Sequence, residues 1–62
     1  MTKQQLLKTS QDHVKKYKDN GHSLGYCAVQ GIVYSILEQE PNDSEAWDSV
    51  QEVIDAVMSA YL

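Results

Sequence analysis

Two histidines and one cysteine, His13, His22 and Cys27, are the side chains in this sequence best suited to bind a metal or attack a substrate. Zinc sites usually show paired ligands at short spacing, whereas His22 and Cys27 are five positions apart and would not share a helical face well. A cysteine-histidine nucleophile pair also needs a third group to orient the base, and none is apparent. Free cysteine is most often a small packing residue. We therefore assign no catalytic residue, no metal and no cofactor.

Other signs of an enzyme are missing from the chain. Its only short glycine spacing is Gly21-x-x-x-Gly25, which lacks the lysine and the serine or threonine that follow in a phosphate-binding loop. Active sites are concave pockets, often of about 300 Å³ or more, and a chain of 62 residues has little interior to spare for one. We expect the protein not to be an enzyme.

The charges of the chain are strongly asymmetric. All lysines precede Asp19 and there is no arginine, whereas seven of the nine acidic residues follow residue 37. The lysines are Lys3, Lys8, Lys15, Lys16 and Lys18. We interpret this as a basic first helix that neutralises an acidic last helix within one bundle.

Within the acidic end, Glu45, Asp48, Glu52 and Asp55 fall at helical spacing and form the acidic stripe. The ordinary interpretation is a solvated helix face, which we favour. The alternative is a surface for a basic partner, or a mimic of the negative charge of DNA that blocks a nucleic-acid-binding protein.

Direct nucleic-acid binding through a helix-turn-helix is disfavoured by the same charges. The middle segment has no lysine or arginine and the last segment is acidic, so phosphates would repel both. A small helical nucleic-acid-binding protein that uses the lysine-rich first segment remains an alternative.

The stretch 22–37 is the most apolar part of the chain and must lie centrally. The spacing of Val29, Ile32, Val33 and Ile36 matches a helix, which we predict over 23–40 with Ser23 as its cap. The rival interpretation is a β-hairpin about Gln30-Gly31, a weaker turn sequence than Asn-Gly.

Helices are also predicted over 2–19 and 43–61. Thr2 and Gln5 have the capping-box spacing, Asn20-Gly21 is a stop signal, and Asn42 and Glu45 mark the third start. The fold class is therefore all-α: one domain over 1–62, a compact up-down-up three-helix bundle. The predicted core is Leu6, Val14, Tyr17, Leu24, Ile32, Val33, Ile36, Trp47, Val50, Ile54, Val57 and Tyr61.

The central helix has two further features. Leu24, Ala28, Gly31 and Ser35 form a ridge of mostly small residues, which we expect to pack against another helix of the same chain, with a dimer seam as the alternative. If the other two helices cover its apolar arc of roughly 220°, the uncovered arc is the predicted partner-binding set. That set is Cys27, Gln30, Gly31, Tyr34 and Glu38, with Tyr34 either free for contact or lying over Gly31.

The function expected from these observations is that of a small acidic protein that binds another protein as a regulator or inhibitor. We also expect self-association, as a homodimer, because so short a chain buries a small core and its single cysteine forbids an internal disulfide. The longest apolar run is too short to cross a membrane, so we expect a soluble, cytoplasmic protein with no membrane contact.

Overall fold

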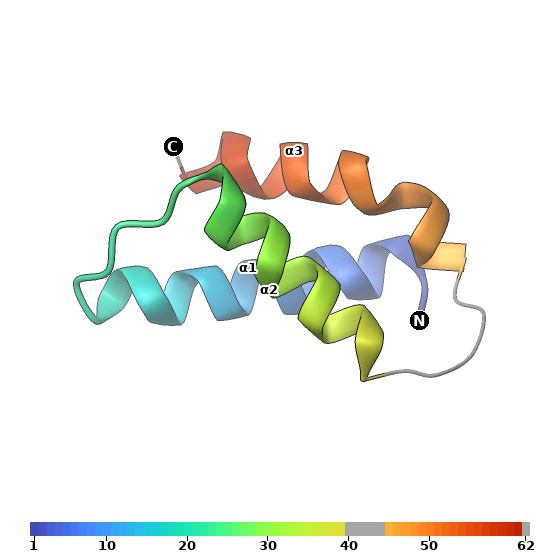
Figure 1. Ribbon diagram of the computed structural model, residues 1–62, viewed down its shortest axis with the longest axis horizontal. Coiled ribbons are helices and arrows are strands. Elements are labelled where there is room, and N and C mark those ends of the chain that lie inside the picture. The colour runs from blue at the N-terminus through green and yellow to red at the C-terminus, as the bar shows by residue number, and fades with distance from the viewer. Residues whose placement is uncertain (40–44, 62) are drawn as a thin grey trace.

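The computed structural model describes residues 1–39 and 45–61. Its helices are α1 (Lys3–Asp19), α2 (Tyr26–Glu38) and α3 (Val50–Tyr61), with a 3₁₀ helix, η1 (Glu45–Ser49), leading into α3. Each α-helix contacts the other two. In Figure 1, α2 crosses obliquely in front of α1 while α3 runs along the top, and the chain direction alternates from one helix to the next. The predicted all-α three-helix bundle is confirmed, and the β-hairpin alternative is wrong.

Local chemistry sets both ends of α1. The Thr2 hydroxyl accepts a hydrogen bond from the backbone N–H of Gln5 at 3.2 Å, and the Gln5 side chain accepts one from the backbone N–H of Thr2 at 2.8 Å. This is the predicted capping box. At the other end the N–H groups of Gly21 and His22 donate to the carbonyls of Lys18 and Tyr17, both at 3.0 Å. Those two bonds form a Schellman motif, and Gly21 adopts the φ of +86° that it needs.

Helix α2 begins later than predicted. Ser23 does not cap it: Gly25 is the N-cap residue, in an extended conformation, and no side chain accepts a hydrogen bond there. Leu24 packs against the core. Leu24 and Val29 have the N′ and N4 spacing of a hydrophobic staple, which favours a start at Tyr26 over one at Ser23. The predicted end at residue 40 lies outside the described residues.

The predicted third helix is divided into two parts. Glu45–Ser49 is 3₁₀ and the α-helix proper begins at Val50, while the predicted cap at Asn42 lies outside the described residues. Ala46 in η1 is fully buried, while its neighbour Trp47 stays 42% exposed with its ring beside that of Tyr34. This contradicts the prediction that Trp47 belongs to the core.

The core lies where the three helices meet. Seven predicted core residues are buried: Leu6, Val14, Val33, Ile36, Val50, Ile54 and Val57. The structure adds Val29, Leu37, Ala46 and Val53. The prediction is wrong for Tyr17, which is 44% exposed in the last turn of α1, where the chain leaves the bundle and the ring packs edge-on to His22. Leu24 and Ile32 are only partly buried, and the side chain of Tyr61 lies outside the described part.

Candidate protein-binding surface

The predicted partner-binding residues lie together on the outward side of α2. Cys27, Gly31, Tyr34 and Glu38 are exposed, and Gln30 is partly exposed. The helical spacing of these residues places them on one side, and the covering helices leave that side open. The sequence pattern thus located an accessible stripe, and its binding role stays a prediction.

Tyr34 contacts an aromatic partner that the sequence analysis had assigned to the core. Its ring lies 6.0 Å from that of Trp47, centroid to centroid, at an interplanar angle of 45°. A Cβ built at Gly31 would meet nothing within 4 Å, so Tyr34 does not lie over Gly31. Tyr34 and Trp47 are 37% and 42% exposed. Two adjacent rings, each more than a third accessible, form a larger contact surface than a lone tyrosine.

A third exposed aromatic, Tyr26, lies at the first turn of α2 and is anchored to α3. The side-chain amide of Gln51 donates a hydrogen bond to the Tyr26 hydroxyl at 2.7 Å and another to a carboxylate oxygen of Asp55 at 3.0 Å. This hydrogen bond links the Tyr26 hydroxyl to α3, while the residue stays 41% exposed. We call Tyr26, Tyr34 and Trp47 the aromatic face; it follows the side of α2 next to α3 and η1.

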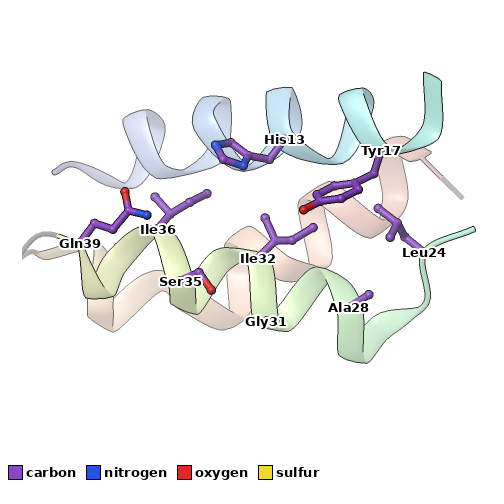
Figure 2. Close-up of a pocket in the computed structure, with 9 residues that line it drawn as sticks. All are labelled: His13, Tyr17, Leu24, Ala28, Gly31, Ile32, Ser35, Ile36 and Gln39. Atoms are coloured by element: carbon purple, nitrogen blue, oxygen red, sulfur yellow. The ribbon is translucent and has the colours of Figure 1, made fainter. Parts of the chain in front are cut away.

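The other side of α2 borders a groove of about 520 Å³ between α2 and α1. Figure 2 shows Ile32 and Ile36 pointing from α2 toward α1, and His13 and Tyr17 on α1. The described residues that line it are His13, Tyr17, Leu24, Ala28, Gly31, Ile32, Ser35, Ile36 and Gln39. Among the residues that the structure describes, no lysine, arginine, aspartate or glutamate lines it.

This groove corrects the prediction for the small-residue ridge. The ridge was expected to pack against a helix of the same chain, yet Ala28, Gly31 and Ser35 are all exposed. Since these three residues stay exposed, α1 and α3 cover less of α2 than the predicted arc of roughly 220°.

The acidic stripe is exposed but partly engaged. Asp48, Glu52 and Asp55 are accessible, and the Glu45 side chain lies outside the described part. Glu52 is paired with Lys3 of α1, and Asp55 accepts the hydrogen bond from Gln51. The free negative charge of the stripe is therefore smaller than its sequence indicates.

The residues that could do chemistry are not brought together. His13 lines the groove, His22 packs edge-on to Tyr17 with ring centroids 5.6 Å apart, and Cys27 is exposed on α2. Among residues 1–39 and 45–61, no group of three or more histidine, cysteine, aspartate or glutamate side chains is placed to hold a metal ion.

No protein-family model, curated protein or solved structure matches this chain. Within the described part of the chain, no helix has the length and apolar character needed to span a membrane.

Proposed function

We propose that this protein binds another protein, as a small non-enzymatic regulator or inhibitor, through the aromatic face and the adjoining stripe of α2. The observation that carries the proposal is the exposure of three aromatic side chains beside a helix that has no charged residue from Tyr26 to Leu37. An uncharged helix surface with accessible aromatic rings is unusual for a segment that only meets water.

The physical chemistry of these residues suits a binding hot spot. Tyrosine and tryptophan bring a large apolar area and a polar tip with few rotatable bonds, so they lose little conformational entropy on binding. The Gln51 hydrogen bond holds Tyr26 and the ring contact with Trp47 restrains Tyr34. Preorganised side chains of this kind contribute more to affinity than mobile ones.

The alternative of a DNA mimic that acts through the acidic stripe has weaker support, because Lys3 neutralises Glu52. The alternative of nucleic-acid binding through the lysines of α1 also has less support, because the ion pair with Glu52 engages one of those lysines, Lys3. Both alternatives require long-range charge, so their binding would fall steeply as salt rises. Binding through the aromatic face would change little with salt.

The test begins with capture of the partner by the immobilised protein, followed by measurement of its affinity for variants. Tyr34→Ala and Trp47→Ala should each weaken binding by about 1 to 2 kcal/mol, that is roughly five- to thirtyfold, with little change in helicity or melting temperature. Tyr17→Ala is the matched control, because Tyr17 is also an exposed tyrosine but borders the groove.

Full affinity in both aromatic variants would contradict the proposal. Recovery of a small molecule or metal in place of any protein would contradict it as well. If Glu52→Gln weakened binding of the partner, and if that binding also fell steeply as salt rose, the DNA-mimic alternative would be favoured.

A further inference from the structure

Two residues of the aromatic face have a carboxylate as a close neighbour along the chain. Glu38 follows Tyr34 by one turn on the exposed side of α2, and residues so spaced have Cβ atoms about 5 to 6 Å apart. Asp48 follows Trp47 directly in η1. Both carboxylates are exposed. Acidic side chains from two elements of the fold therefore border the pair of rings.

The third aromatic residue is joined to a carboxylate through Gln51. The Gln51 amide donates one hydrogen bond to the Tyr26 hydroxyl at 2.7 Å and another to Oδ1 of Asp55 at 3.0 Å. Asp55 is exposed as well. Negative charge thus accompanies the aromatic face along α3 too.

The elements that carry the aromatic face contain no cationic side chain to balance these carboxylates. All lysines precede Asp19 and the chain has no arginine, so α2, η1 and α3 have neither. Lys3 of α1 reaches α3, where it pairs with Glu52. Among the residues that the structure describes, Glu38 and Asp48 take part in no ion pair. The charge beside the rings is therefore left for a partner to neutralise.

The rings of Tyr34 and Trp47 are themselves suited to a cation. Their centroids are 6.0 Å apart and their planes are inclined by 45°, so the rings do not lie flat on one another. The two residues are 37% and 42% exposed. The face of an aromatic ring is electrostatically negative and attracts a cation within about 6 Å of its centroid, most strongly at tryptophan. The rings and the carboxylates beside them thus attract the same kind of group.

Arginine fits this combination better than lysine does. A guanidinium is flat and weakly hydrated, so it can stack on a ring while its N–H groups donate to carboxylates at its edge. The ammonium group of lysine is compact and strongly hydrated, so it loses more hydration on an aromatic surface. Glu38 and Asp48 supply the acceptors.

Other occupants of this face are disfavoured by its charge. Two copies that met through it would bring together the carboxylates of both, and an acidic protein segment or a nucleic-acid phosphate would be repelled in the same way. An uncharged apolar segment would cover carboxylates without pairing them, which costs the hydration of those groups.

We propose that the partner presents an arginine-bearing segment, whose guanidinium lies on the rings of Tyr34 and Trp47 and donates hydrogen bonds to Glu38 and Asp48. This assignment rests on the proposed function, since both use the aromatic face. One guanidinium replaces few bound ions, so the salt dependence stays far below that of the charge-driven alternatives.

The first test uses the fluorescence of Trp47, which is the only tryptophan of the chain and therefore reports this face directly. The probes are the end-blocked tripeptide Gly-Arg-Gly and its counterparts with citrulline, lysine or glutamate at the centre. Citrulline has the shape of arginine without the charge. The arginine peptide should bind at least about threefold more tightly than the citrulline peptide, with lysine between them and no effect from glutamate. Equal titration curves for arginine and citrulline would overturn the proposal.

Carboxylate variants show whether the preference arises at the rings. Glu38→Gln and Asp48→Asn should each reduce the preference for arginine over citrulline, with unchanged helicity. Asp12→Asn, the same change at an exposed carboxylate of α1, is the matched control and should leave the preference intact. An equal loss in all three variants would mean that net charge alone attracts the peptide, which contradicts a site at the rings.

A random peptide library displayed on phage separates this assignment from the proposed function. Peptides that the protein retains, but that Tyr34→Ala or Trp47→Ala releases, should be enriched in arginine relative to the input library. Ring-dependent peptides without that enrichment would overturn the assignment and leave the proposed function standing. If no retained peptide depended on either ring, both would fail. Self-association of the protein that Trp47→Ala abolished would give the face to a second copy and also overturn the assignment.

Discussion

Lys3, in the first turn of α1, forms an ion pair with Glu52 of α3 across 49 positions of sequence. The pair joins the basic first helix to the acidic third helix, as the charge distribution of the sequence indicated. Both side chains are at least half exposed, at 50% and 65%, so water screens the attraction strongly. The contact therefore orients α1 against α3 more than it stabilises the fold.

Replacing Lys3 with glutamine should lower the free energy of unfolding by less than about 1 kcal/mol, because exposed ion pairs contribute about 0 to 1 kcal/mol. Urea unfolding of Lys3→Gln, Glu52→Gln and the double variant gives the coupling energy directly. We expect that coupling to vanish at high salt. A coupling above about 2 kcal/mol that persisted in salt would contradict a screened surface contact.

Replacing Ser10 with alanine should stabilise the protein. Ser10 is fully buried in α1, and its hydroxyl has no hydrogen-bond partner within the described part of the chain. A buried hydroxyl without a partner costs roughly 1 to 3 kcal/mol, and alanine also has the higher helix propensity. We expect Ser10→Ala to raise the free energy of unfolding by about 1 kcal/mol or more in urea titrations.

Ser59→Ala in α3 is the control for that experiment, because Ser59 is exposed and the change there reports helix propensity alone. Its gain should be smaller, about half a kcal/mol. If Ser10→Ala were instead destabilising, the hydroxyl would have a partner such as a buried water molecule.

The parts of the fold that depend on adjacent residues were predictable from the sequence. The ends of α1 follow from the Thr2 and Gln5 capping box and from Gly21, since each of these contacts joins residues within five positions. Exposure of the stripe that contains Tyr34 was predictable as well, because helical spacing decides which residues share a side.

Features that depend on contacts between helices were not predictable in the same way. Periodicity placed Trp47 in the core, whereas Trp47 lies exposed in η1 with its ring beside that of Tyr34 on α2, a contact between elements that helical spacing does not report. Periodicity also shows which residues share a face but not how far a neighbouring helix covers that face. For this reason the small-residue ridge around Gly31 was predicted to pack against another helix of the chain, whereas in the structure Gly31 is exposed.

Replacing Leu37 or Ile32 with alanine should lower the free energy of unfolding by different amounts, although both are aliphatic residues of α2. Leu37 is fully buried, so Leu37→Ala should lower the free energy of unfolding by about 2 to 5 kcal/mol, enough to unfold much of so small a domain. Ile32 is only partly buried at the groove, so Ile32→Ala should cost less than the 2 to 5 kcal/mol typical of a fully buried position. Thermal and urea unfolding at low concentration would compare them, and an equal cost would mean that Ile32 is covered.

Two glycines of this chain should respond to alanine in opposite directions. Gly31 lies inside α2 with open space around its Cβ position, so Gly31→Ala should raise the free energy of unfolding by about 0.5 to 1 kcal/mol in dilute solution. Gly21 also has open space but adopts a φ of +86° after α1. An alanine there must take a left-handed conformation, so Gly21→Ala should lower stability by about 1 to 2 kcal/mol.

The pair of variants separates backbone strain from steric fit, because neither new methyl group would meet an atom of the described residues within 4 Å. Urea titrations of both variants at one low protein concentration are sufficient. The dependence of the free energy of unfolding on urea concentration should be the same in both, which shows that the substitutions do not alter the unfolded state. If Gly31→Ala were destabilising under these conditions, another part of the same chain would have to approach Gly31, and the groove beside α2 would be closed within the single chain.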